Sequence, residues 1–263
     1  MTAANVGFVG TGRMGAPMVR RLVGAGHEVC ALGRTGEKRA TLAQLGAQPV
    51  PDIAEVGAGA DVVVVCVFTD TQVRDVCLDS PMIAGMPRGS TLVLHTTGSP
   101  RTAEGVAAYA VEYGVAVVDA PVSGGPHNIA AGDLTLFVGG DAEVVSRIEP
   151  VLSSYAAPIL HVGSIGTGQR VKLVNYALFA AQIGLLREGV ELGARLGVDE
   201  ETLLKALPHA SANSRALAGL AARGSVAAFS AAVGDFVGKD VAVVRGVAAE
   251  LGGDLGLLDD VIG

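Results

Sequence analysis

The sequence predicts an α/β fold, with an N-terminal Rossmann-type, doubly wound and mostly parallel sheet followed by an all-helical C-terminal domain. Three observations predict it. Strand and helix patterns alternate up to about residue 163, only helical patterns follow, and a glycine-rich turn joins the first strand to the first helix. Alternating segments with apolar strands are typical of a parallel sheet that helices cover on both faces.

Short apolar runs are predicted to form the strands of this sheet. The clearest is 61–67, which holds four consecutive valines, as expected of a parallel strand buried on both faces. The other expected strands are similarly apolar and lie at 6–9, 28–32, 91–94, 116–118 and 134–138. Helices are expected after the first strand, at about 37–45 and 101–113, and from about Asp141 onward.

The second half of the chain is predicted to be helical throughout. A long helix covers about 166–196 and is ended by Gly197, and the next helix begins at Asp199 with acidic residues in its first turn. The segment 236–240 is expected to open a further helix. We therefore expect a cofactor-binding domain at 1–163 and a helical substrate and dimerisation domain at 164–263, which begins with the long interdomain helix.

The glycine-rich turn indicates a dinucleotide site. It consists of Gly10, Thr11, Gly12, Arg13, Met14 and Gly15, a Gly-x-Gly-x-x-Gly pattern. The first glycine permits the tight turn, the second lets backbone approach a pyrophosphate, and the third lets the helix pack closely on the strand. The helix N-terminus adds free N–H groups and the positive end of its dipole. Its place between a strand and a helix favours a dinucleotide site over an ordinary tight turn.

The exit of the second strand indicates which dinucleotide is bound. Enzymes that bind the 2′-hydroxyl form usually carry Asp or Glu there, and this chain has no acid before Glu37. Arg34 is placed to pair with a 2′-phosphate, with Thr35 and Lys38 assisting. We therefore expect NADP rather than NAD. The alternative is that Arg34 is an ordinary solvated arginine.

Two further strand ends carry polar segments at the carboxyl edge of the sheet, where ligands bind in such folds. After Asp119, the consecutive amides of Ser123, Gly124 and Gly125 are suited to form a concave nest of N–H donors for a carboxylate. Thr97 follows another strand and is expected to bond the nicotinamide ribose. The alternatives are an ordinary turn and a plain loop rich in Ser and Thr.

Lys172 is the strongest candidate for chemistry in the second half. Its neighbours are apolar, and no other charged residue occurs before Arg187. Partial burial without an acidic partner lowers the pKa of a lysine, as acid–base work near neutral pH requires. Asn175 shares its helical face and is expected to hold the reacting oxygen, or to cap local backbone groups. Lys239 is expected to reach the same cleft, unless it is an exposed helix lysine.

Composition argues against several other classes of function. The net charge is −7 without a basic stripe, so no nucleic-acid partner is expected. The three cysteines lack metal-ligand spacing and the five histidines are never paired at i, i+4, so no metal is expected. The first strand begins too early to leave room for a signal peptide, and the apolar stretch 173–186 is too short to span a bilayer. We expect a cytoplasmic protein without a membrane partner.

Together these motifs resemble the β-hydroxyacid dehydrogenase family, which includes 3-hydroxyisobutyrate dehydrogenase and tartronate semialdehyde reductase. The resemblance covers nearly the whole chain and is carried by 8–15, 119–125, 166–175 and 239–240. It implies that Lys172 is catalytic, that Asn175 binds substrate and that Lys239 lines the closed cleft. It further implies that the 123–125 loop holds the substrate carboxylate and that Thr97 contacts the cofactor. NADP and a homodimer or homotetramer are also implied.

The chain departs from the family pattern at four places. The segment 67–70 replaces a common Leu-Pro, His95 and His127 stand where smaller residues are common, and the chain ends at Gly263, earlier than usual. The activity expected is NADP-dependent hydride transfer between nicotinamide and a short 3-hydroxy acid or its semialdehyde, with Lys172 as general acid and base. The alternatives are an imine reductase-like enzyme of the same fold, in which the lysine is usually replaced, and a non-catalytic NADP-binding protein.

Overall fold

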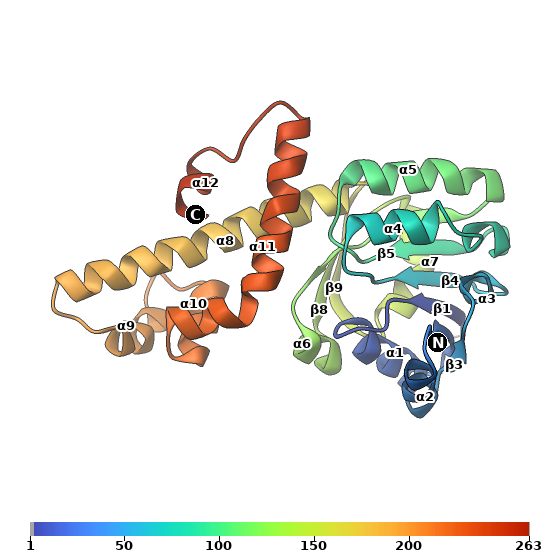
Figure 1. Ribbon diagram of the computed structural model, residues 1–263, viewed down its shortest axis with the longest axis horizontal. Helices are drawn as coiled ribbons and strands as arrows, with labels where there is room; N and C mark the ends of the chain where they lie inside the picture. Colours follow the sequence, from blue (N-terminus) through green and yellow to red (C-terminus); the bar gives the residue numbers. More distant parts are fainter. Residues whose placement is uncertain (1–2, 263) are drawn as a thin grey trace. The chain divides into compact units, whose positions relative to one another are not determined.

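The computed structural model describes residues 3–262, apart from the side chains at 235–236, and divides into two compact units. The units are Met1–Lys172 and Leu173–Gly263, so the division falls inside helix α8 (Thr167–Arg195). The first unit alternates strands and helices, and the described part of the second is helical (Figure 1). The predicted fold class is confirmed. The domain boundary expected at residue 163 stays a prediction.

The strands of the first unit form one sheet, in the order β3-β2-β1-β4-β5-β6-β8-β7, with β9 paired to β8. From β3 to β6 all neighbours are parallel, whereas β8 is antiparallel to β6 and β7. The bounds are β1 Asn5–Val9, β2 Glu28–Leu32, β3 Gln48–Val50, β4 Val62–Val65, β5 Thr91–Leu94, β6 Ala116–Asp119, β7 Val122–Ser123, β8 Leu134–Gly139 and β9 Ala156–Gly163.

Three strands were not expected from the sequence: β3, β7 and β9. β3 is three residues long and contains Pro49, and β7 is two residues long. β9 contains Pro158 and is exposed or half-buried along most of its length. Short or proline-containing edge strands lack the apolar run that marks a buried parallel strand.

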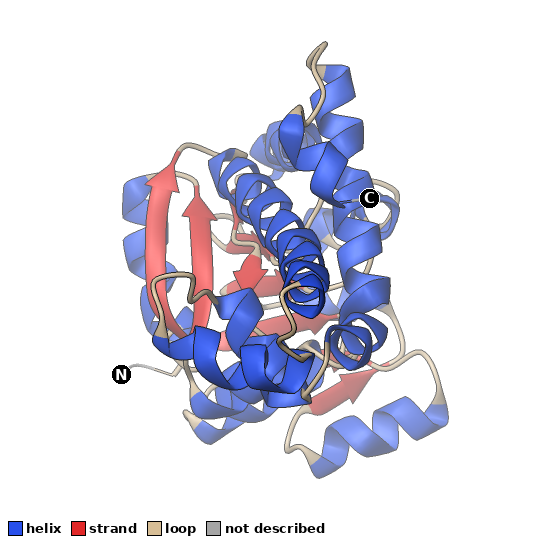
Figure 2. Cartoon of the chain, turned by 90° about the vertical axis from the view of Figure 1, so that its left-hand side faces the viewer, coloured by secondary structure: helices blue, strands red, loops and turns tan. Residues whose placement is uncertain are grey.

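Helices cover both faces of the sheet (Figure 2). Side chains of α1, α2, α6 and α7 pack in one apolar cluster with the strands, and those of α3, α4 and α5 pack in another. The bounds are α1 Gly15–Gly24, α2 Gly36–Gln44, α3 Ile53–Gly57, α4 Asp70–Cys77, α5 Pro100–Ala110, α6 Pro126–Ala131 and α7 Ala142–Leu152, with 3-10 turns at Ile83–Gly85 and Val111–Tyr113.

The four valines of β4 show why this sheet needs two helical layers. Val62 and Val64 belong to one cluster, and Val63 and Val65 belong to the other. Successive strand side chains point to opposite faces, so a continuous apolar run is buried only when both faces are covered. Burial of each valine is worth about 1.5–3 kcal/mol. The predicted burial of this strand on both faces is confirmed.

The second unit is built from helices that begin at polar caps. Asp199, Ser214 and Ser225 each accept a hydrogen bond from a first-turn amide of the helix that follows. The helices are the rest of α8, α9 Glu200–Ala206, α10 Arg215–Arg223, α11 Val226–Glu250 and α12 Leu257–Ile262, with a 3-10 turn at Leu207–His209.

The prediction that 236–240 opens a helix is wrong. These residues lie well inside α11, which begins at Val226. Gly234 and Gly238 lie inside this helix. A glycine inside a helix costs only about 1 kcal/mol, however, and apolar packing further along the helix, at Val244, offsets it.

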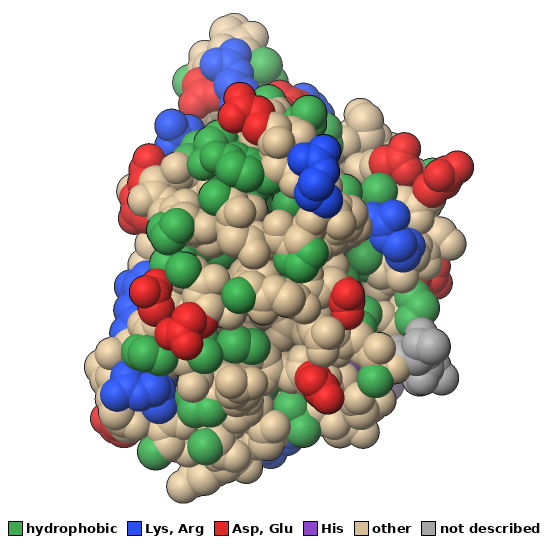
Figure 3. Space-filling view, turned by 90° about the vertical axis from the view of Figure 1, so that its right-hand side faces the viewer, with side chains coloured by type: hydrophobic (Ala, Val, Ile, Leu, Met, Phe, Trp, Pro, Cys, Tyr) green, Lys and Arg blue, Asp and Glu red, His purple; other side chains and the backbone are tan. Residues whose placement is uncertain are grey.

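Two surface properties bear on the expected partners. No single helix in residues 3–262 combines the length and apolar composition needed to cross a membrane. Taken together, α10 and residues 226–234 are long and apolar enough, but the two segments are bent by 108° relative to each other. On the face drawn in Figure 3, acidic and basic side chains are interspersed. That face therefore carries no basic stripe.

Candidate active site

The turn between β1 and α1 has the steric features of a dinucleotide-binding loop. Gly10 has a φ of +97°, and a Cβ there would collide with the carbonyl of Cys66. A Cβ at Gly15 would lie 2.8 Å from the ring of Phe8, so the helix approaches the strand as closely as the third glycine allows. At Gly12, by contrast, no described atom lies within 4 Å of a Cβ. Gly12 therefore faces open space that a diphosphate would fill.

The N-terminus of α1 completes this loop. Thr11, Arg13 and Met14 lie in the turn itself, and among the described residues no side chain caps the helix. The first amides of a helix need acceptors, and an anion at the N-terminus supplies them while meeting the positive end of the dipole. The residues present fit a dinucleotide diphosphate.

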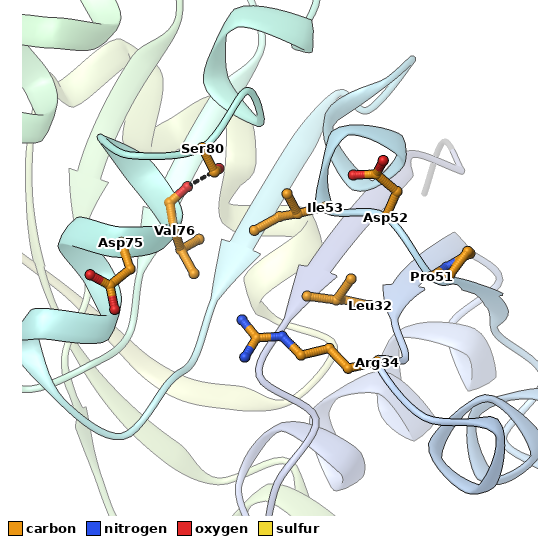
Figure 4. Close-up of a pocket in the computed structure, with 8 residues that line it drawn as sticks. All are labelled: Leu32, Arg34, Pro51, Asp52, Ile53, Asp75, Val76 and Ser80. Carbon is orange, nitrogen blue, oxygen red and sulfur yellow. Dashed lines mark hydrogen bonds between the residues drawn. The ribbon is translucent and has the colours of Figure 1, made fainter.

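A pocket of about 680 Å³ lies beside the end of β2 (Figure 4). Arg34, Asp52 and Asp75 are among its lining residues, and the Arg34 guanidinium points into it. Thr35 and Lys38 are not among its lining residues. Thr35 caps α2, and its Oγ1 accepts a hydrogen bond of 3.2 Å from the Lys38 amide. The full lining is Leu32, Arg34, Pro51, Asp52, Ile53, Asp75, Val76 and Ser80.

The segment after β5 is held by buried polar contacts. The hydroxyl of Thr96 donates to the carbonyl of Val67 at 2.9 Å, and Thr97 beside it is 7% exposed. Thr97 therefore lies at the carboxyl edge of the sheet, where the sequence predicted it. Its role in binding cofactor stays a prediction.

His95 forms a buried pair with Tyr155. Its Nδ1 lies 2.6 Å from the carbonyl oxygen of Ala120, and its Nε2 lies 2.8 Å from the Tyr155 hydroxyl. Because a carbonyl can only accept, Nδ1 carries the proton and Nε2 accepts from tyrosine. Burial lowers the pKa of His95 to about 4, although the bond to Ala120 acts in the opposite direction. This departure from the family pattern is therefore a neutral, structural histidine.

The predicted carboxylate loop follows β6 and is more constrained than expected. Ser123 belongs to β7, Gly124 has a φ of +132°, and the Gly125 amide donates a 2.8 Å hydrogen bond to Oδ1 of Asn128. A Cβ at Gly125 would lie 3.2 Å from the ring of His127. The Gly125 amide thus already has an acceptor in this conformation, and the carboxylate-binding role of the loop stays a prediction. Asn128 was missed by sequence reasoning.

Lys172 lies beside this loop. Lys172 is only 6% exposed. Its Nζ donates a 2.7 Å hydrogen bond to the carbonyl of Val122, the residue directly before Ser123. Asn175 follows three residues later on α8 and is half-buried. Lys239 belongs to the second unit, where Nζ lies 2.7 Å from a carboxylate oxygen of Asp240.

Two buried residues that the sequence did not single out tie α8 to the sheet. Asp119 is fully buried and accepts hydrogen bonds from the amides of Gly166 at 2.6 Å and Gln169 at 2.7 Å. Burial raises the pKa of the Asp119 carboxyl to about 6, and the two amides oppose that rise. The Gln169 side chain accepts from the Gly98 amide at 3.0 Å and donates to the Thr96 carbonyl at 2.9 Å.

Metal-ligating side chains do not gather anywhere in the described part of the chain. Residues 3–262 contain no group of three or more His, Cys, Asp or Glu that could hold a metal ion.

Two family models match nearly the whole chain. Residues 5–163 match the NAD binding domain of 6-phosphogluconate dehydrogenase. Residues 166–261 match the model described as NAD-binding of NADP-dependent 3-hydroxyisobutyrate dehydrogenase.

Individual proteins agree with these models. L-threonate dehydrogenase from Cupriavidus necator is 33% identical over 212 residues, which is 80% of this chain and 71% of that protein. The structure of Mycobacterium tuberculosis 3-hydroxyisobutyrate dehydrogenase with L-serine matches with a TM-score of 0.88 at 30% identity, covering 99% of this chain and 92% of that one. An imine reductase from Pseudomonas sp. is 20% identical, with a TM-score of 0.66 over 95% of this chain and 77% of its own, and shares the fold.

Proposed function

This chain belongs to the β-hydroxyacid dehydrogenase family of NAD(P)-dependent oxidoreductases, and we propose that it transfers a hydride between NADP and a short 3-hydroxy acid or the corresponding semialdehyde. One observation carries the proposal. A buried lysine, Lys172, hydrogen-bonds the backbone at the start of a glycine-containing loop at the carboxyl edge of the sheet. That edge is where ligands bind in folds of this type.

Each end of the substrate has a candidate partner on this chain. The substrate carboxylate binds at Ser123, Gly124 and Gly125, through backbone amides and the Ser123 hydroxyl. Gly124 has a φ of +132°, a conformation that side-chain-bearing residues rarely adopt. The Gly125 amide keeps its Asn128 partner, which holds the loop in place, and the other groups bind the carboxylate. Asn175, one helical turn beyond Lys172, holds the reacting oxygen.

Lys172 moves the proton. During oxidation the neutral amine takes the hydroxyl proton while the carbinol C–H bond breaks. The hydrogen leaves as hydride with both electrons of that C–H bond. During reduction the ammonium donates its proton to the carbonyl oxygen. The Val122 carbonyl accepts one N–H of the amine and so fixes where Nζ lies. Acid–base catalysis by a positioned group is worth roughly 10²–10⁴ in rate.

The cofactor is proposed to be NADP. The residues that would hold it are those of the Gly10–Gly15 turn for the diphosphate, Arg34 with Thr35 and Lys38 for the 2′-phosphate, and Thr97 for the nicotinamide ribose. Bound nicotinamide supplies or accepts the hydride. The preference for NADP is supported by the guanidinium in the pocket beside β2 and by the description of the C-terminal family model.

Domain roles and assembly extend the proposal. Residues 1–163 bind the cofactor, and residues 164–263 supply substrate contacts, including Lys239, and the interface of a homodimer or homotetramer. Light scattering on the purified protein, with and without NADPH, gives the subunit number directly.

A turnover screen tests the proposal. C3 to C5 hydroxy acids and semialdehydes are assayed with both cofactors at the nicotinamide absorbance band, and a cyclic imine is included in the same panel. We expect NADP-dependent turnover of a short 3-hydroxy acid or its semialdehyde. Turnover of the imine alone would identify an imine reductase instead. Binding of NADPH without consumption in any assay would identify a non-catalytic nucleotide-binding protein.

A further inference from the structure

We infer that Asp119 and Gln169 are positioning residues, which fix the first turn of α8 on the ends of β5 and β6 so that the Lys172 amine stays beside the 123–125 loop. The inference rests on the proposed function of Lys172. Neither residue is assigned a contact with substrate or cofactor. Both act through the backbone and the helix that carries the lysine.

Asp119 supplies the cap that α8 requires. The first amides of a helix have no partner within it, and here both carboxylate oxygens of one buried side chain accept from them. Oδ1 accepts from Gly166 and Oδ2 from Gln169, at 2.6 Å and 2.7 Å. Because both oxygens are used, the carboxylate fixes the direction of the first turn as well as its position. A negative charge at this end also meets the positive end of the helix dipole.

Two glycines, Gly139 and Gly168, leave room for the Asp119 carboxylate at the start of α8. A Cβ at Gly139 would collide with the Asp119 carboxylate. A Cβ at Gly168 would lie 2.8 Å from both the carboxylate and the carbonyl oxygen of Asp119. The helix start, the end of β8 and the end of β6 therefore approach each other at a distance that only glycine permits.

Gln169 extends the anchoring to the neighbouring strand end. Its side-chain amide donates to the carbonyl of Thr96 and accepts from the amide of Gly98, so it holds the backbone on both sides of Thr97. Thr96 in turn bonds the carbonyl of Val67 after β4. Three successive parallel strands, β4, β5 and β6, thus reach the start of α8 through a chain of hydrogen bonds.

The consequence for Lys172 follows from spacing. Lys172 lies three residues after Gln169 on the helix, and Val122 lies three residues after Asp119 on the loop. The helix therefore bonds both ends of the segment 119–122: the Gln169 amide donates to Asp119, and the Lys172 amine donates to the Val122 carbonyl. A shift of one residue in the helix start would rotate the lysine by about 100° around the helix axis. Misplacement by about 1 Å in an active site costs on the order of 100-fold in rate.

The test compares Asp119→Asn and Gln169→Met with matched controls. Asp141→Asn changes an exposed carboxylate that caps α7 through one oxygen, and Gln44→Met changes an exposed helical glutamine. We expect kcat to fall on the order of 10- to 100-fold in both positioning variants. The Kd for NADPH should stay within about twofold of wild type in Asp119→Asn, whereas Gln169→Met also loosens the backbone on both sides of Thr97. We also expect the limb of the pH–rate profile that reports Lys172 to move. The control variants keep the wild-type kcat and profile.

A purely structural role gives a different pattern. Folded Asp119→Asn and Gln169→Met would then unfold at lower temperature while their kcat and pH–rate profile stayed at wild type, and that result overturns the inference. Should Asp119→Asn fail to fold, Gln169→Met decides, since its backbone amide still reaches Asp119. Lys172→Ala separates the two proposals: wild-type turnover in that variant defeats the proposed function itself. If Lys172→Ala loses turnover while Asp119→Asn and Gln169→Met keep the wild-type kcat and pH–rate profile, only this inference is defeated.

Discussion

The Lys172 amine donates a 2.7 Å hydrogen bond to the carbonyl oxygen of Val122. Lysine near a helix start is ordinarily solvated, and this one is 6% exposed. A buried amine held on a carbonyl keeps one hydrogen bond in either protonation state, since a neutral amine still has N–H groups to donate. The contact therefore allows the proton exchange that the proposed function requires without loss of position.

The glycines of α8 provide a test of the close approach at its N-terminus. Gly168→Ala should destabilise the protein by about 1–3 kcal/mol, because its Cβ would collide with the carbonyl of Phe137 and with Asp119. Gly189→Ala, on the same helix, meets no described atom within 4 Å and should stabilise it by about 0.5–1 kcal/mol through helix propensity. Thermal unfolding of both variants measures the difference, and equal shifts would contradict the packing described here.

Asp119 makes stability fall as pH rises. Burial raises the pKa of its carboxyl to about 6, from about 3.9 in unfolded chains. A raised pKa means that the folded state holds the proton more tightly. The associated stability, about 3 kcal/mol, is present below pH 4 and is lost as the pH rises through 6. Free energies of unfolding of Asp119→Asn and wild type between pH 4 and 7 should differ in slope in that direction.

His95 acts with the opposite sign in the same pH range. Burial lowers its pKa to about 4, from about 6.5 when unfolded, so the associated stability is present above pH 6.5 and is lost as the pH falls through 4. The magnitude is again about 3 kcal/mol. His95→Gln should remove this pH dependence, so that the free energy of unfolding then follows the pH dependence contributed by Asp119. A pH profile of His95→Gln parallel to that of wild type would contradict the buried, neutral assignment.

Arg34 should decide between the two cofactors. Arg34→Ala removes a guanidinium from the pocket beside β2 and should raise the KM for NADPH by about 10- to 100-fold, the worth of a charge-assisted hydrogen bond to phosphate, with little change for NADH. Arg20→Ala, at an exposed position on α1, is the matched control. Equal efficiency of wild type with NADPH and NADH would exclude the assignment.

Asn128 should affect substrate binding through the loop. Asn128→Ala removes the acceptor of the Gly125 amide and should raise the substrate KM by about tenfold, as expected for one lost hydrogen bond, while the Kd for NADPH stays constant. Asn128→Asp retains an oxygen acceptor for the Gly125 amide but adds a negative charge beside the substrate carboxylate, so it should raise the substrate KM as well. Steady-state kinetics of the pair measures this, and a substrate KM of Asn128→Ala equal to wild type would place the loop outside the substrate site.

Local patterns predicted the elements whose signals lie within a few residues. The strands at 28–32 and 91–94 were predicted with their observed bounds, because continuous apolar runs mark buried parallel strands. Helix α4 was missed although its signal is present: Thr69 and Gln72 form a reciprocal capping box.

The anchoring of the site could not be predicted in the same way. Asp119 contacts amides 47 and 50 residues further along the chain, and Gln169 contacts the backbone 71 and 73 residues before it. Neither spacing has a periodic signature, since it depends on how the strands are ordered in the sheet. The loops that carry chemistry are a prediction from the sequence, and the structure adds what holds these loops in place.

Single-turnover hydride transfer in Lys172→Ala tests the central claim most directly. The variant is mixed with NADPH and the substrate identified in the turnover screen, NADPH binding is measured separately, and Lys205→Ala, an exposed lysine paired with Glu201, serves as control. The proposed role predicts unchanged NADPH binding and a loss of roughly 10²–10⁴ in the transfer rate. Transfer at the wild-type rate with NADPH bound would contradict it.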